Sequence, residues 1–171
     1  MAAMSQRFPE PSAAPAHRSA QEQARFVAQL TDMFEQRISF NELLGLRVQS
    51  LAAPVVSLRF DMKPELVGHF LYGRLHGGVI SAVLDATAGL ALMAAIADKH
   101  PADSADQVLQ RFARMGTIDL RVDFLRQGVG KHFVASAEVT RLGGRVGSTQ
   151  MRLVNEDGLL IATGAASYIL A

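Results

Sequence analysis

Residues 77–97 read Gly-Gly-Val-Ile-Ser-Ala-Val-Leu-Asp-Ala-Thr-Ala-Gly-Leu-Ala-Leu-Met-Ala-Ala-Ile-Ala, and Asp85 is the one charged residue among them. A helix that is apolar or small on every face is typical of a buried helix. This one would be roughly 30 Å long, the width of a small domain. The stretch therefore predicts one long central helix that the rest of the chain has to cover.

The sequence on both sides of this helix alternates between apolar and polar residues, the pattern of half-buried strands. Residues 56–62 alternate before the helix, and residues 117–124 alternate after it. Further strands are expected at 46–52, 133–142, 145–154 and 159–170. Strands joined by turns as short as Gly143-Gly144 must be antiparallel, so we expect one antiparallel sheet of about six strands.

Two further helices are expected outside the sheet. One runs from about Ser19 to Ser39, where Ser19 and Glu22 have capping-box spacing and an apolar residue recurs every fourth position. A short one lies within residues 102–114, with Ser104 and Gln107 as its capping pair, and residues 64–74 are expected to be an irregular connection. The chain thus predicts an α+β protein in which a curved sheet wraps the central helix, beside an extra N-terminal helix.

The length of 171 residues suits one domain, which we place at 19–171 after a flexible leader at 1–18 that is rich in Ala, Pro and Ser. The sheet does not cover an all-round apolar helix completely, so a second copy of the chain is expected to cover the remainder. The leader has no apolar core like that of a secretory signal, and we expect a cytoplasmic protein.

Composition excludes several classes of function. The net charge of +1 gives no field to hold nucleic acid or an anionic membrane, and residues 86–97 are the longest stretch without ionisable side chains, too short for a membrane span. The absence of cysteine excludes a thiolate metal site and a cysteine nucleophile, and the histidines show no metal-ligand spacing. No nucleotide-binding glycine motif or Gly-x-Ser-x-Gly elbow occurs, so neither a cofactor nor a metal is expected.

Asp85 is the first candidate for chemistry, because an ionised carboxylate among apolar residues costs several kcal/mol unless it is paired. The alternatives are an aspartate paired with an arginine of the sheet, or one that faces solvent. The second candidate is His76-Gly77-Gly78, since the first turn of a helix has free N–H groups that can hold an anion or a developing oxyanion.

Gly77 and Asp85 are eight residues apart, or ~12 Å along a helix. One helix therefore cannot direct both groups at the same carbonyl. Two antiparallel copies related by a two-fold axis can, which indicates an active site shared between subunits.

The block Leu75-His76-Gly77-Gly78-Val79-Ile80, with Asp85 nine residues after His76, resembles the hotdog-fold thioesterases of the PaaI type. The segment Met115–Arg126, in register with it, strengthens the resemblance, which covers roughly residues 33–170. The sequence is most similar to the YigI-like branch, which hydrolyses medium- and long-chain acyl-CoA. The resemblance implies a hotdog fold and an acyl-CoA substrate.

The resemblance also implies roles for individual residues. Asp85 would be the nucleophile or the general base toward water, the Gly77 N–H of the opposite subunit would polarise the thioester carbonyl, and His76 would order that loop. Gly78 lets the substrate approach the backbone, and His69 lies shortly before the motif. Basic groups for the CoA phosphates would come from Arg141 and Arg145, although a solvated hairpin is an equal alternative.

The sequence departs from its relatives at two places. Some relatives have Ser or Thr four residues after the acid to hold the nucleophilic water, whereas this chain has Gly89. Many have Asn or Gln shortly before His-Gly-Gly, whereas this chain has His69-Phe70-Leu71-Tyr72. His69 either replaces the amide or lies on the surface, and the surface position is slightly favoured; the group that positions the water is left open.

We therefore expect an acyl-CoA thioesterase without a cofactor, a homodimer or a dimer of dimers. The acyl chain would lie between subunits beside Val83, Leu84 and Leu90. The low content of aromatic residues favours an aliphatic acyl chain over an aromatic one. Two alternatives stay open, a hydratase or dehydratase on the same fold with His69 as base, and a non-catalytic module that binds acyl-CoA.

Overall fold

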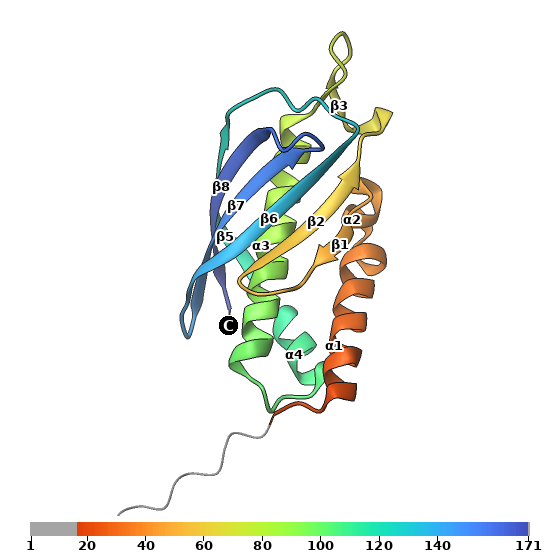
Figure 1. Cartoon of the computed structure of the whole chain (residues 1–171). Helices are drawn as coiled ribbons and strands as arrows, with labels where there is room; N and C mark the ends of the chain where they lie inside the picture. The colour runs from red at the N-terminus through yellow and green to blue at the C-terminus, as the bar shows by residue number, and fades with distance from the viewer. Residues whose placement is uncertain (1–16, 171) are drawn as a thin grey trace, which may run out of the picture.

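The computed structural model describes residues 17–170, which form a six-stranded antiparallel sheet and the helices beside it (Figure 1). The sheet has the strand order β1-β2-β6-β7-β8-β5. Its strands are β1 (Arg47–Ser50), β2 (Val55–Asp61), β5 (Gly116–Phe124), β6 (His132–Leu142), β7 (Val146–Asn155) and β8 (Leu160–Ile169). The predicted α+β architecture and the antiparallel pairing are confirmed.

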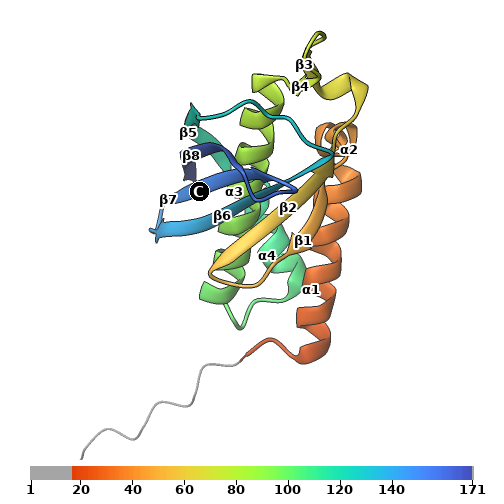
Figure 2. The same cartoon turned by 45° about the horizontal axis from the view of Figure 1, so that its top comes forward.

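The central helix α3 (Gly77–Lys99) lies along one face of this sheet, as Figures 1 and 2 show from two directions. Val83, Leu84 and Leu90 in its middle have no exposed surface. By length and composition alone α3 could cross a membrane, but 67% of its most apolar window is buried within the described structure. It is the core helix that the sequence predicts.

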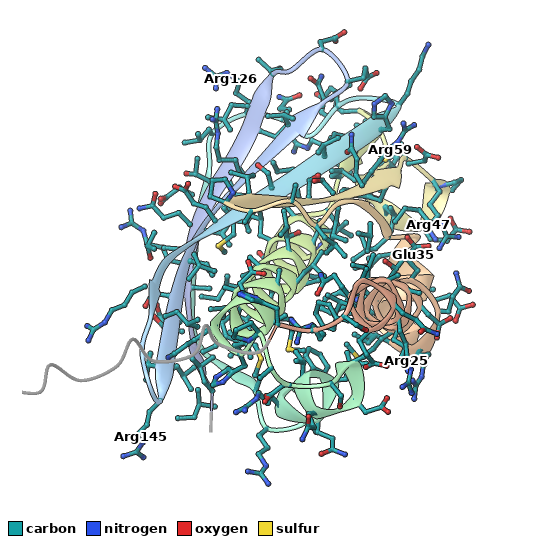
Figure 3. All side chains as sticks on the ribbon, turned by 60° about the horizontal axis from the view of Figure 1, so that its bottom comes forward. Arg25, Glu35, Arg47, Arg59, Arg126 and Arg145 are labelled. Atoms are coloured by element: carbon teal, nitrogen blue, oxygen red, sulfur yellow. The ribbon has the colours of Figure 1, made fainter. Side chains whose placement is uncertain are left out.

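The N-terminal helix differs from the continuous helix expected up to Ser39. α1 (Ala20–Asp32) is followed by a wider π-helical segment, η1 (Met33–Arg37), and the extended backbone of Ile38 separates η1 from α2 (Ser39–Leu44). The carboxylate of Glu35 in η1 accepts a hydrogen bond from the Val48 N–H of β1 at 2.7 Å and lies 3.6 Å from Arg47 (Figure 3). These contacts with a distant strand hold the wide turn, and no local pattern could show them.

Glu22 caps a different helix from the one expected. The Ser19 hydroxyl accepts a hydrogen bond from the Glu22 N–H as predicted, but the Glu22 carboxylate accepts one from the Ala105 N–H, in the first turn of α4 (Ala105–Phe112). α4 has the full Ser104–Gln107 capping box that the sequence predicts. Because α4 packs on both α1 and α3, this carboxylate ties the N-terminal helix to the core.

The predicted leader at 1–18 lies almost wholly outside the described residues. Of its last two residues, Arg18 donates hydrogen bonds to the carbonyl oxygens of Ala97 and His100 at the end of α3 and of Asp103 in the connection to α4.

The segment expected to be an irregular connection contains a short ribbon. After a single turn, η2 (Pro64–Leu66), strands β3 (Val67–His69) and β4 (Arg74–Leu75) pair antiparallel. A Cβ on Gly68 would lie 2.5 Å from His76 Cα, so only glycine allows this close approach. The ribbon thus packs directly on the residue before α3.

β5 forms one edge of the sheet, and within residues 17–170 no strand pairs with its outer side. The alternation of residues 117–124 predicts an apolar face, yet Ile118 is 59% and Phe124 is 55% exposed. The register shifts between Thr117 and Asp119, and this irregularity takes Ile118 out of the regular alternation.

Candidate active site

Asp85 lies on α3 where the helix faces β5 and β8, and two hydroxyl groups meet its carboxylate there. The Thr117 hydroxyl donates to Asp85 Oδ1 at 2.9 Å, and the Tyr168 hydroxyl donates to the same oxygen at 2.6 Å. Neither alternative for this aspartate is found, because it is half-buried and forms no ion pair with any residue in the described range 17–170. Oδ1 is therefore held by two donors, whereas Oδ2 accepts no hydrogen bond from that part of the chain.

Tyr168 is the more enclosed of the two donors. It is 5% exposed, and its hydroxyl also lies 2.6 Å from the main-chain oxygen of Asp85. Burial, together with the hydrogen bond to the Asp85 carboxylate, raises the pKa of Tyr168 well above its usual value. The phenol therefore stays protonated and remains a donor at any neutral or mildly basic pH.

A cavity of about 290 Å³ opens beside Asp85. Apart from Asn41 and the Asp85 cluster, its lining is apolar or glycine, and the large apolar side chains are Phe34, Ile38, Phe40, Phe112 and Met115. The rings of Phe34 and Phe112 meet edge to face with centroids 5.7 Å apart. Among the described residues that line the cavity, Asp85 and Tyr168 are the ionisable ones. A carboxylate at an apolar cavity suits a ligand with one polar reacting group and an apolar tail.

The cavity does not lie where the sequence places the acyl chain. Val83, Leu84 and Leu90 are all 0% exposed, because they are packed in the core and none of them reaches the cavity. The apolar lining comes instead from η1, α2, α4 and the residues that follow α4. The N-terminal part of the chain therefore does more than cover the core, since it builds one wall of the cavity.

The first turn of α3 has the arrangement that a hydrogen-bond donor site needs. His76 is the N-cap, and its Nδ1 accepts a hydrogen bond from the Gly78 N–H at 2.9 Å. The next two amides, of Val79 and Ile80, donate to the His76 carbonyl oxygen. The Gly77 N–H has no acceptor among residues 17–170, and it is the amide that the sequence assigns to the oxyanion.

A single chain does not bring Gly77 and Asp85 together. Gly77 is not among the residues that line the Asp85 cavity. This agrees with the ~12 Å that eight residues span along a helix axis. The two groups share one site only if a second chain supplies one of them.

The other predicted binding residues lie apart from the cavity. The Gly78 N–H is already bound to the His76 side chain. His69 lies on the β3–β4 ribbon, where its ring centroid is 5.8 Å from that of Phe70 and 4.8 Å from that of Tyr72. No group of three or more His, Asp or Glu side chains that could hold a metal ion occurs within residues 17–170.

Arg141 and Arg145 belong to the β6–β7 hairpin, which lies at the opposite end of α3 from Gly77. The Lys99 ammonium group at the end of α3 donates to the Gly143 carbonyl oxygen at 3.3 Å and joins the hairpin to this end. Arg145 is exposed and its side chain points away from the molecule (Figure 3). Within one chain these arginines contact neither Asp85 nor the first turn of α3.

Thr117 and Tyr168 are the site residues that the sequence analysis missed as partners of Asp85. They are 32 and 83 residues away from it in the chain, and only the sheet brings them to one carboxylate. A signal was present for Thr117, which lies in the segment Met115–Arg126 that carries the resemblance. No sequence pattern points to Tyr168 as a partner of Asp85, apart from its place in the last strand.

The sequence profile of the thioesterase superfamily matches residues 72–162, from the turn of the β3–β4 ribbon to the start of β8. The chain belongs to this superfamily. The matched range contains the first turn of α3, Asp85 and Thr117, and the predicted resemblance is confirmed.

Individual relatives agree with this assignment. The chain is 40% identical to the medium/long-chain acyl-CoA thioesterase YigI of Salmonella typhimurium over 139 residues, which are 81% of this chain and 90% of that protein. A crystal structure of a thioesterase-superfamily protein from Shewanella oneidensis is 37% identical, with a TM-score of 0.82 over 87% of this chain and 97% of that one. The PaaI protein of Escherichia coli, 15% identical with a TM-score of 0.67 over 86% of this chain and 94% of that one, shares the fold.

Proposed function

We propose that the protein hydrolyses acyl-CoA thioesters with medium or long aliphatic chains to the free acid and CoA. The observation that carries the proposal is the Asp85 carboxylate, held on one oxygen by Thr117 and Tyr168 and placed at an apolar cavity. The acyl-CoA thioesterases to which the chain is similar support the substrate class.

The reaction needs a group that attacks the thioester carbonyl, and Asp85 Oδ2 is the oxygen left available for it. In one route Oδ2 attacks the carbonyl carbon, the CoA thiolate leaves, and water hydrolyses the acyl-aspartyl anhydride. In the other route Oδ2 takes a proton from a water that attacks the carbonyl. A single turnover in ¹⁸O-water that leaves the label on Asp85 identifies the anhydride route, because attack of water on the aspartyl carbonyl of the anhydride puts it there and the general-base route does not.

The negative charge that develops on the carbonyl oxygen needs a donor, and the Gly77 N–H of a partner subunit fills this role in the proposal. Donors aimed at a developing oxyanion are among the largest contributions to catalysis of acyl transfer. The first turn of α3 is suited to it because the His76 side chain occupies the Gly78 N–H and leaves that of Gly77 open.

A homodimer, or a pair of such dimers, is the assembly that this site requires. The exposed edge at β5 offers the contact surface, with Ile118, Phe124 and Leu125 all at least 48% exposed. A Cβ on Gly77 would lie 3.5 Å from the Phe124 ring, so this edge and the first turn of α3 are neighbours in one chain. A partner chain paired along β5 would therefore also approach the Gly77 N–H.

The remaining features of the proposal follow the sequence. The thioesterase domain comprises residues 19–171 after the leader at 1–18, and the enzyme works in the cytoplasm. Arg141 and Arg145 would contact CoA phosphates from the β6–β7 hairpin, and His69 and Gly78 would lie beside the bound substrate.

The hydratase alternative needs a histidine base near Asp85. Its candidate, His69, does not line the cavity of its own chain and would reach Asp85 only from a partner subunit. The acyl-CoA thioesterases to which the chain is similar favour hydrolysis over hydration.

The test is release of free CoA thiol from a panel of acyl-CoAs of increasing chain length, aliphatic and aromatic, with Asp85→Asn beside the wild type. The protein has no cysteine, so a thiol reagent gives no background from the enzyme. We expect turnover in the wild type that is greatest for medium and long aliphatic chains and falls at least a hundredfold in Asp85→Asn. Tight binding of acyl-CoA without turnover in the wild type would instead identify a binding module.

A further inference from the structure

The Tyr168 hydroxyl occupies a position that the thioesterase reaction can use. It lies 2.6 Å from Asp85 Oδ1 and 2.6 Å from the main-chain oxygen of the same residue. Tyr168 comes from the last strand, 83 residues further along the chain, and its side chain is 5% exposed. A buried phenol aimed at a carboxylate is a costly arrangement for packing alone, because its polar end has to find a partner.

The Tyr168 ring packs beside Gly89, one helical turn after Asp85. A Cβ at Gly89 would lie in ordinary contact with it, 3.8 Å from both Cε1 and the hydroxyl oxygen of Tyr168. Residues four apart lie on one face of a helix, so a side chain at position 89 would stand beside Asp85. The chain supplies no hydroxyl from α3 itself at this point, and β8 supplies one instead.

We infer that Tyr168 is a positioning residue for the proposed thioester hydrolysis: it holds Asp85 Oδ1 so that Oδ2 is presented to the substrate. The inference rests on the proposed function. A hydrogen bond donated to a carboxylate fixes its orientation. With one oxygen held, the free oxygen has a defined direction for attack or for proton transfer.

The cavity around Asp85 has no basic side chain among the described residues, so hydroxyl groups are the donors that hold the carboxylate. Residues of η1, α2, α3, α4, β5 and β8 contribute to its lining. Tyr168 is the second ionisable group there, and burial and Asp85 keep it protonated by raising its pKa. Thr117 is the other donor, and it lies on the exposed edge strand.

The experiment compares Tyr168→Phe with Tyr72→Phe in the assay of acyl-CoA hydrolysis. The chain has two tyrosines, and Tyr72 is 62% exposed on the β3–β4 ribbon, so it controls for the same chemical change away from Asp85. For Tyr168→Phe we expect kcat to fall about tenfold and KM to stay within about twofold. The split follows because the substrate contacts are kept while the carboxylate loses the donor that fixes its orientation.

A second substitution keeps the hydroxyl and the fold. In the Tyr72→Phe background, 3-fluorotyrosine incorporated in place of tyrosine labels position 168 alone and makes the phenol a stronger donor. This protein keeps the donor to Asp85, so its kcat should stay close to that of the Tyr72→Phe protein, in contrast to the fall expected in Tyr168→Phe.

Wild-type hydrolysis with an unchanged kcat in the folded Tyr168→Phe protein would overturn the inference and leave the proposed function intact. A wild type that hydrolyses no acyl-CoA would overturn the proposed function itself. An equal fall in kcat in Tyr168→Phe and in the 3-fluorotyrosine protein would show a packing role and would also contradict the inference.

Discussion

The first turn of α3 and the turn that carries Asp85 belong to one helix, but their polar groups are controlled in different ways. In the first turn the neighbouring residue His76 caps Gly78, and the Gly77 N–H is left without an acceptor. At Asp85 the control comes from afar, from Thr117 on β5 and Tyr168 on β8. The first turn therefore presents a donor by leaving it unpaired, whereas the turn at Asp85 presents one carboxylate oxygen as an acceptor because the other is held.

Removing the donor at the first turn should have the largest effect. Gly77→Pro removes this N–H and keeps the start of the helix, since proline fits the first position of a helix and the backbone of His76 is already extended. We expect kcat to fall about 10²- to 10³-fold, as for other oxyanion donors, with the unfolding midpoint little changed. Gly77→Ala keeps the N–H and adds a Cβ at ordinary contact distance from Phe124, so it should lose far less activity.

The apolar cavity beside Asp85 can be altered without changing the carboxylate. Phe40 lines the cavity and is 55% exposed, so Phe40→Ala should remove contact with the distal part of a bound acyl chain. We expect kcat/KM for long chains to fall about tenfold and that for short chains to stay unchanged, measured by thiol release. Leu43→Ala is the matched control, because Leu43 is 58% exposed on the same helix but does not line the cavity.

The local capping at the first turn should contribute less. His76→Ala removes the cap on the Gly78 N–H and should lower the free energy of unfolding by about 1 kcal/mol and kcat several-fold, as the first turn frays. His76→Asn places another good capping side chain there and should recover most of the stability. Equal stability of the two variants in denaturant unfolding would speak against the capping role.

The smallest effect is expected at the hairpin, far from both turns. Arg145→Glu should raise KM two- to threefold at low salt with kcat unchanged, and the difference should fade as salt screens the charge. An identical KM for both proteins at low ionic strength would leave Arg145 as a solvated side chain.

The same contrast explains how much the sequence could predict. The apolar run of α3, the alternating strands, the Ser104–Gln107 cap and the His76-Gly77-Gly78 turn all depend on neighbours within a few residues, and each is present. The partners of Asp85, the cavity wall from η1 and the break at Ile38 depend on contacts between distant segments. Those contacts have no periodicity or spacing in the chain, so only the folded structure shows them.

A heterodimer tests the central claim that Asp85 of one subunit works with Gly77 of its partner. Asp85→Asn and Gly77→Pro chains with different affinity tags are co-expressed, and the mixed dimer is purified through both tags. One of its two sites then holds an intact Asp85 and an intact Gly77, so the account predicts about half of wild-type turnover per dimer, whereas each parent homodimer is nearly inactive. A purified heterodimer no more active than its parents would contradict a site shared between subunits.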